Sequence, residues 1–515
     1  MSSTVRTWLQ RSPLFRSAVL AGTIALASIP AAQAASDFTP LPGTWIVSAE
    51  QDGKPGRGMA IDVQDGVLVM QVYNYRANGT ATFHLAVGNI DGNQVAAPLK
   101  SYRGGRYFGS GPLSGVEDGD AGEVRIEFTS ATQAQLRFPG EPTVAIQRFR
   151  FENTPASALP SAYWLMSMQD SSGKAVYSAI ALSGLDTSTG PAMAMALPNG
   201  TQIQVSCSYS ATLQGFNCSN GSATPAVRLQ FQTALHQLSG SAQLDGSSYQ
   251  LVGQRMLSPD GYDSLVFSDT TPVPASGTWI VTGEKNGQPG RGMAMDVQTG
   301  TLVMQVYNYQ ADGNATFHLG VGAFASGQAS APLKSYQGGR YFGSGPLSGT
   351  EASTAGEVFL DFSSPTRGHI RFPGEGAVAI ERFQFAPVAP DPAGLLGHWT
   401  FHDTTNKETA HVALTQVDGT AATTAGGGVR CSFLNPSTGQ VRCVETFTIS
   451  GRGSVYLKDY RFVLQADTGS GKALQAGELA RSDVLPDDSS TQKNSLLALR
   501  TMDRRGMKLG LGTSF

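Results

Sequence analysis

Four tryptophans stand at nearly even intervals in this chain, and their spacing constrains the fold more than any other feature. They follow one another every 115 to 120 residues, and each opens a short apolar stretch after a join rich in proline, serine and glycine. A repeated opening of this kind is typical of a repeated structural unit. The 515 residues therefore predict four modules of similar length, which begin near Trp45, Trp164, Trp279 and Trp399.

The first and third modules are copies of one another. The segment that begins at Gly43 matches the one at Gly277 with a constant offset of 234 residues, and about two-thirds of the positions are identical. The second and fourth modules share only the tryptophan, a cysteine pair and a late arginine, so we name the modules A1, B1, A2 and B2. Their predicted bounds are residues 41–153 for A1, 158–268 for B1, 275–387 for A2 and 393–503 for B2, followed by a tail at residues 504–515.

The joins between modules are rich in proline and small residues, as in ENTPASALP and APVAPDPAG. Such segments do not hold a sheet ladder and behave as linkers. We therefore expect the modules to move relative to one another.

The first 34 residues have the pattern of a secretory signal peptide. Three arginines precede a short apolar run, and Ala32-Gln33-Ala34 supplies a small-x-small cleavage site. The apolar run is too short to span a bilayer. The mature chain is therefore expected to be secreted or periplasmic, in the envelope of a bacterial cell.

Composition favours an all-β protein and argues against a nucleic-acid partner. The chain has 61 glycines, only 15% charged residues and a net charge of −3, whereas a nucleic-acid binder needs a concentrated basic face. Within A1 apolar residues alternate with polar ones, as in GMAIDVQ and EVRIEF, between turns such as DGKPG and RANG. Seven or eight short antiparallel strands per module predict four tandem small β-barrels, with an open sandwich as the alternative.

The four cysteines form one close pair in B1 and one in B2. In an exported protein such pairs predict disulfides across neighbouring strands, and neither pair has the spacing of a metal site. The expected bonds join Cys207 to Cys218 and Cys431 to Cys443. No metal and no cofactor is expected.

Each module also ends on an arginine in its last predicted strand. In a closed meander the first and last strands are neighbours, so this arginine would lie across the tryptophan indole in a cation–π contact that plugs one end of the barrel. The pairs are Trp45 with Arg148, Trp164 with Arg255, Trp279 with Arg382, and Trp399 with Arg500.

A G-x-W on the first strand with an arginine on the last resembles the calycins, which include lipocalins, avidins and small bacterial metalloprotease inhibitors. Gly43, Gly277 and Gly397 carry this pattern, while B1 has Ala162 in place of the glycine. The resemblance implies a small β-barrel in which the tryptophan and arginine are structural. The A modules are also similar to repeats of uncharacterised secreted bacterial proteins, which implies no function.

The candidate ligand-binding segment is SYRGGRYFGSGPLSG, which begins at Ser101 and is repeated almost unchanged from Ser335. Aromatic and arginine side chains on a glycine-rich loop can stack on a sugar ring or a peptide. The alternative is a barrel corner whose aromatic residues pack inward. The candidates are Tyr102, Arg106, Tyr107 and Phe108 in A1, and Tyr336, Arg340, Tyr341 and Phe342 in A2.

No catalytic signature is present. His84 and His318 occupy matched positions without HExxH or H-x-H partners, and we expect them to face solvent. The acids at matched positions, Asp62 with Asp296 and Glu123 with Glu357, are expected on exposed strands or turns. The chain has no GxSxG motif and supports no Ser-His-Asp assignment, so we expect no enzyme.

These patterns predict an exported, non-enzymatic binding or surface-interaction protein whose ligand is a polymer, a protein or a small apolar molecule. One alternative is a peptidase inhibitor, which the calycin resemblance implies. A second is an outer-membrane β-barrel, since the C-terminal strand alternates and ends on the aromatic Phe515. Membrane association would then run through that strand.

Overall fold

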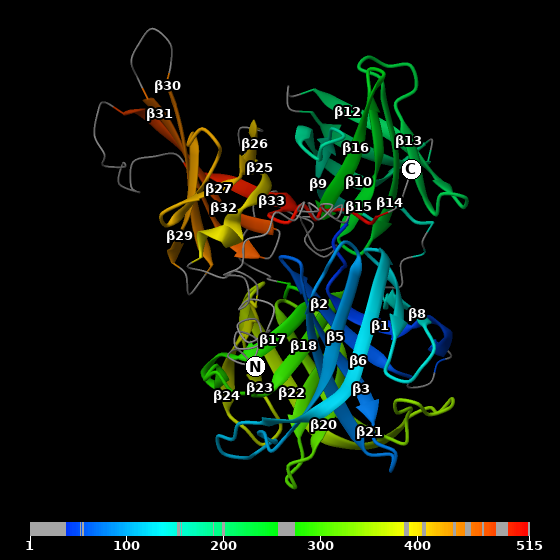
Figure 1. Cartoon of the computed structure of the whole chain (residues 1–515). Helices are drawn as coiled ribbons and strands as arrows, with labels where there is room; N and C mark the ends of the chain where they lie inside the picture. Colours follow the sequence, from blue (N-terminus) through cyan, green and yellow to red (C-terminus); the bar gives the residue numbers. More distant parts are fainter. Residues whose placement is uncertain are drawn as a thin grey trace, which may run out of the picture. The chain divides into compact units, whose positions relative to one another are not determined.

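The computed structural model describes residues 38–512, apart from several short segments. The predicted signal peptide and Phe515 lie outside the described residues. The segments left out are residues 52, 54–55, 152–154, 156, 189, 198–200, 256–272, 386–390, 404–407, 436–438, 449–454, 466–467 and 480–492. Within the part described, every regular element longer than four residues is a β-strand (Figure 1).

A1 is a closed barrel of eight antiparallel strands in simple meander order. Its first strand pairs with both the second and the last, so no edge strand is exposed. A 3-10 turn, η2 (Ser48–Glu50), follows the first strand. The strands are β1 (Gly43–Val47), β2 (Gly58–Gln64), β3 (Val67–Tyr75), β4 (Ala81–Asn89), β5 (Gln94–Arg103), β6 (Val116–Ser130), β7 (Gln133–Arg137) and β8 (Val144–Arg148).

A2 repeats this barrel, including the turn η3 (Thr282–Glu284) after its first strand. Its inward side chains pack with one another around the fully buried Trp279, with Met293 and Met304 among them. The strands are β17 (Gly277–Val281), β18 (Gly292–Gln298), β19 (Thr301–Tyr309), β20 (Ala315–Ala325), β21 (Gln328–Gln337), β22 (Thr350–Ser364), β23 (Arg367–Arg371) and β24 (Ala377–Arg382).

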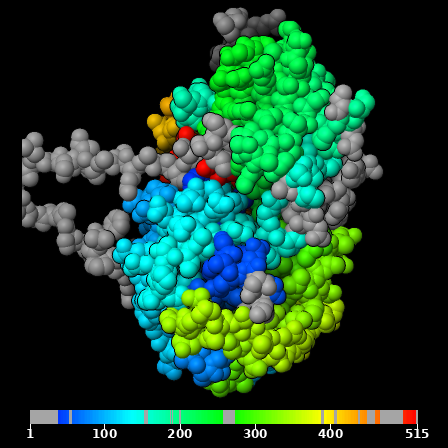
Figure 2. Space-filling model, turned by 90° about the vertical axis from the view of Figure 1, so that its right-hand side faces the viewer, coloured from blue at the N-terminus to red at the C-terminus, as the bar shows by residue number. Residues whose placement is uncertain are grey.

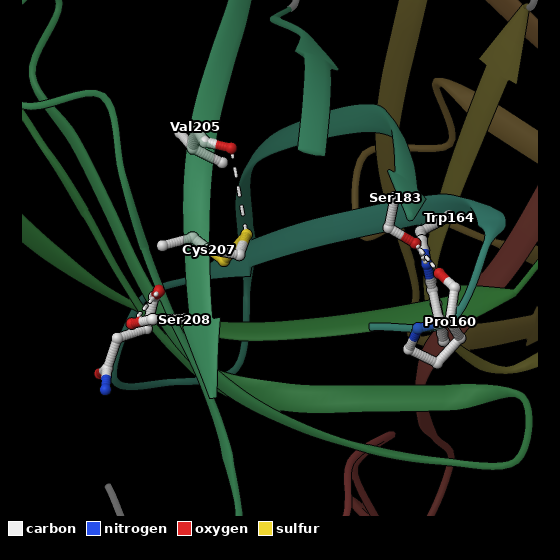
Figure 3. Close-up of a disulfide and its surroundings, with 8 residues drawn as sticks. Pro160, Trp164, Ser183, Val205, Cys207 and Ser208 are labelled. Atoms are coloured by element: carbon white, nitrogen blue, oxygen red, sulfur yellow. Dashed lines mark hydrogen bonds between the residues drawn. A yellow bond between two sulfur atoms is a disulfide. The ribbon is translucent and has the colours of Figure 1, made fainter. Parts of the chain in front are cut away.

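B1 is the third closed eight-stranded barrel, in which β9 pairs with both β10 and β16. The predicted disulfide joins Cys207 to Cys218, which face one another on adjacent strands (Figure 3). The strands are β9 (Ala162–Gln169), β10 (Ala175–Thr187), β11 (Gly190–Ala196), β12 (Gln202–Ser210), β13 (Gly215–Ser219), β14 (Val227–Ala234), β15 (Gln237–Leu244) and β16 (Ser247–Arg255).

The expectation of a fourth closed barrel is wrong for B2, which is a nine-stranded sheet with β26 and β27 at its two ends. These end strands are separated in the chain only by Thr415, which breaks what is one strand in the other modules. The second predicted disulfide, Cys431–Cys443, is confirmed. After the turn η4 (Pro392–Leu395), the strands are β25 (Gly397–Asp403), β26 (Glu408–Leu414), β27 (Gln416–Asp418), β28 (Ala421–Thr423), β29 (Val429–Asn435), β30 (Gln440–Thr448), β31 (Val455–Gln465), β32 (Thr468–Leu479) and β33 (Lys493–Asp503).

The chain alternates A and B, but the modules associate by type. A1 and A2 form one compact unit, here called the A unit, and B1 and B2 form a second, the B unit. In the B unit, Leu165 and Val252 of B1 pack with Leu497 and Leu499 of β33 and with Leu509 of the tail. A1 and A2 are in contact with one another, as described below, and motion between modules stays a prediction. No helix among the described residues has the length and apolarity needed to cross a membrane.

Candidate functional site

The structure places every tryptophan opposite its arginine on neighbouring first and last strands. Trp45 pairs with Arg148, Trp164 with Arg255 and Trp279 with Arg382 in backbone register, and Trp399 pairs with Arg500. In B2 the guanidinium of Arg500 lies 5.5 Å from the centroid of the Trp399 indole, within cation–π range.

The G-x-W pattern has a local physical cause. In the three modules that carry it, the indole N–H donates to a backbone carbonyl four residues earlier, as from Trp45 to Leu41 at 3.0 Å. Gly43 has a φ of 123°, which favours glycine, and a Cβ there would overlap the guanidinium of Arg148. B1, which has Ala162 instead, directs the indole of Trp164 to the hydroxyl of Ser183 at 2.8 Å (Figure 3).

In A1 and A2 the arginine reaches across to the other barrel. Arg148 forms a buried ion pair with Asp296 at 2.7 Å, and Arg382 forms the matching pair with Asp62 at 2.6 Å. The expectation that both aspartates are exposed is wrong, since each is 1% exposed. They point out of their own barrel, but the neighbouring barrel covers that face.

The candidate loop forms a reciprocal clasp between the barrels. We define the clasp as residues 101–108 of A1 and residues 335–342 of A2. Arg106 contacts Glu284 of A2 at 3.0 Å and Glu375 at 3.2 Å, and both glutamates also hold the fully buried Arg291. Arg340 makes the matching contacts with Glu50 and Glu141 of A1, which hold Arg57.

A phenylalanine of each clasp segment lies against a histidine of the other barrel. The ring centroids of Phe108 and His318 are 5.0 Å apart, and those of Phe342 and His84 are 5.1 Å apart. The expectation that these histidines face solvent is therefore wrong, because the opposite clasp covers them. Burial lowers the pKa of each histidine to about 4, and the nearby charge of Arg76 adds to the effect on His84.

Aromatic side chains fill the rest of the contact between the barrels. Tyr73 stacks on Tyr307 with ring centroids 5.7 Å apart, and Phe83 and Tyr309 make a T-shaped contact with ring centroids 5.9 Å apart. These residues lie on the faces that point away from the barrel interiors, so β3 is buried on both sides. Burial raises the pKa of both Tyr73 and Tyr307, so their hydroxyls stay neutral in the interface. Figure 2 shows the surface of A1, in blue to cyan, meeting that of A2, in yellow-green.

The predicted binding residues thus occupy different positions within the contact. Tyr102 is buried against Phe83, while Arg106 and Phe108 contact the opposite barrel. Tyr107 is half-buried, and its backbone N–H donates a hydrogen bond to the hydroxyl oxygen of Ser110. Their copies Tyr336, Arg340, Tyr341 and Phe342 repeat these positions. A ligand-binding role for the eight residues stays a prediction, and the two arginines and two phenylalanines among them contact the other barrel.

The loop continues beyond the clasp into an exposed tip, defined as residues 109–114 and 343–348. Both tips read GSGPLS, and their leucines, Leu113 and Leu347, are each 48% exposed. The base of each tip is fixed to the other barrel, since the N–H of Gly109 donates to Glu375 and that of Gly343 to Glu141, both at 3.0 Å. The tips are therefore held in one geometry while their apolar side chains face outward.

Removing the ring of Phe108 is expected to weaken the A unit. Phe108→Ala should cost about 2 kcal/mol, below the 3–5 kcal/mol of a fully buried ring, because Phe108 is only partly buried against His318 and Phe372. Urea unfolding followed by hydrogen exchange of A-unit peptides measures the change. Leu113→Ala in the exposed tip is the control and should change stability by less than about 0.5 kcal/mol. Equal effects of the two substitutions would contradict the clasp.

The fold and this site define a class: an all-β protein of small antiparallel barrels, two of which are joined face to face by copies of one loop. No family model matches the chain, and no curated protein matches it. Among solved structures it is similar to the isotype 1 transferrin-binding protein B from serogroup B Neisseria meningitidis, with 13% identity over 66% of this chain and 69% of that one. The TM-score of this likeness is 0.13. In the described residues no group of three or more histidine, cysteine or acidic side chains is arranged to hold a metal ion.

Proposed function

We propose that this protein is an exported, non-enzymatic binding protein of the bacterial envelope that uses the two tips as its binding surfaces. One observation carries the proposal: the exposed tips are identical, although the exposed start of the next strand differs between the copies. That strand begins VEDGD in A1 and TEAST in A2. Packing does not require the same exposed leucine twice, whereas two equal binding sites do.

The structure of the tips supports a protein partner with an apolar pocket. A loop fixed at its base loses little conformational freedom on binding, which favours affinity. A single exposed leucine beside proline and glycine supplies apolar contact with little charge. Two equal sites on one compact unit gain avidity for a partner that repeats along a surface or polymer.

We also propose that the barrels are related to those of calycins and that the protein is located in the bacterial envelope. The barrels, the glycine that makes room for the arginine and the indole hydrogen bond support a calycin-like origin. The two disulfides support an oxidising compartment. Peptidase inhibition and outer-membrane insertion remain alternatives, and inhibition assays and membrane fractionation with heat-modifiable gel migration test them.

Tip variants of the full chain test the binding function. The wild-type chain, Leu113→Ser, Leu347→Ser and the double variant are screened on a glycan array and against an immobilised envelope-protein fraction. For any hit, one substitution should weaken binding by roughly tenfold, the effect of losing about 1.4 kcal/mol of apolar contact, and the double substitution should weaken it further. The control Phe359→Ser changes another exposed apolar side chain of A2, 43% exposed, and should have no effect. Binding that is indifferent to the double substitution excludes the tips.

A further inference from the structure

The contact between A1 and A2 is self-complementary. Gln71 of A1 donates to the hydroxyl of Thr278 at 3.2 Å, and Gln305 of A2 donates to that of Thr44 at 3.0 Å. The backbone hydrogen bonds between the barrels also occur twice. The N–H of Gly104 donates to the carbonyl of Gly313, and the N–H of Gly338 donates to that of Gly79, both at 2.8 Å. The ion pairs and clasp contacts are also doubled. Contacts that recur with the roles exchanged have the geometry of an isologous, two-fold dimer interface.

We infer that this surface also binds a second copy of the chain, so that A1 of one molecule pairs with A2 of another and the reverse. A second molecule presents the same residues at the same positions as the partner in the same chain. Two chains that exchange A modules satisfy both interfaces and leave none open, which is a closed domain-swapped dimer. The inference does not depend on binding by the tips.

The connection between the A modules makes exchange feasible. A1 and A2 are separated in sequence by the whole of B1 and two proline-containing joins, so no short turn enforces their pairing. A tether raises the local concentration of A2 around A1, which favours pairing within one chain in dilute solution. Exchange is therefore expected when the A unit is opened transiently and allowed to close at high protein concentration.

Steric complementarity provides a selective test. The ring of Tyr309 in A2 lies so close to Gly105 in A1 that a Cβ at Gly105 would overlap it. Gly105→Leu therefore blocks the pairing of A1 with A2 in its own chain, whereas Tyr309→Ala makes room for a larger side chain. In a mixture, A1 of the Gly105→Leu chain meets A2 of the Tyr309→Ala chain, and the other two modules form a wild-type contact.

The two full-length variants are mixed in equal amounts, taken through mild urea and returned to buffer. Light scattering after size exclusion should then give the mass of two chains for the mixture and of mainly one chain for each variant alone. If both variants are folded by circular dichroism and the mixture stays at the mass of one chain, the inference is wrong.

A second measurement covers the case in which Gly105→Leu does not fold. Wild-type chains with two different affinity tags are mixed at high concentration and taken through the same urea cycle. Purification on one tag should recover the other tag after the cycle and not before it. Absence of the second tag after the cycle would overturn the inference.

Discussion

Replacing Asp62 with alanine is expected to destabilise the A unit by about 3–5 kcal/mol, the largest effect of any single substitution considered. Asp62 accepts hydrogen bonds from both terminal nitrogens of Arg382, at 2.6 and 2.7 Å, and from the N–H of Thr278 at 2.9 Å. Its loss leaves the charge of Arg382, whose side chain is 6% exposed, without its counter-ion. Asp296→Ala should act in the same way on Arg148. Urea unfolding read by hydrogen exchange of peptides from β3 and β19 measures the loss separately from the B unit.

Two further variants separate charge from general damage. Glu357→Ala removes an acid at an exposed position of β22 and should change stability by less than about 0.5 kcal/mol. The double variant Asp62→Leu/Arg382→Met removes both charges and should recover at least half of the loss, because a buried ion pair is often replaced by apolar residues at little cost. A loss for Asp62→Ala as small as that for Glu357→Ala would show that the ion pair does not hold the barrels together.

The barrels could be predicted because the inner face of each strand is encoded locally. In β2 the alternation of Met59, Ile61 and Val63 with polar or small residues assigns one side to the core, and turn residues mark the ends. The interruption of the B2 strand at Thr415 has no comparable signal. Neither glycine nor proline stands there, so the sequence predicts one continuous strand.

The sequence of β3 reflects the contact between the A barrels, although the alternation of apolar and polar residues does not explain it. The segment VLVMQVYNY of β3 is apolar or aromatic on both faces, with Tyr73 and Tyr75 on the outer one. A strand with two apolar faces is typical of one covered on both sides. Such a pattern predicts that the outer face is buried but does not identify the partner. The partner of Asp62 is 320 residues away in the chain, and no local pattern connects the two positions.

The long separation in the chain between the candidate loop and the residues it contacts also explains why the sequence predicts ligand binding for this loop. Tyrosine, arginine and glycine on a loop have the chemistry that recognises ligands, and they have equally the chemistry of a protein interface. Only the structure shows that Arg106 meets glutamates of another module. The near-identity of the two clasp segments is then a consequence of symmetry, since each must fit the same surface.

Acidification is expected to weaken the A unit strongly between pH 6.5 and 5. Burial lowers the pKa of His84 and His318 to about 4 in the folded protein, while histidine in an unfolded chain titrates near 6.5. Over this range the unfolded state therefore binds more protons than the folded state, and stability falls as the pH falls. The stabilisation is fully present above about pH 6.5 and is lost progressively towards pH 4. Each histidine should contribute about 1.5 kcal/mol between pH 6.5 and 5, and the pair about 3 kcal/mol.

Non-titrating variants assign this pH dependence to the clasp. In His84→Gln/His318→Gln the difference in unfolding free energy between pH 6.5 and 5 should shrink by about 3 kcal/mol, as measured by urea unfolding with hydrogen exchange of A-unit peptides. The exposed His369 supplies the control, and His369→Gln should leave the difference unchanged. Aspartate and glutamate in model peptides titrate near pH 4, which lies below the chosen range. A double variant with the pH dependence of the wild type would mean that the histidines are open to solvent and that Phe108 and Phe342 do not cover them.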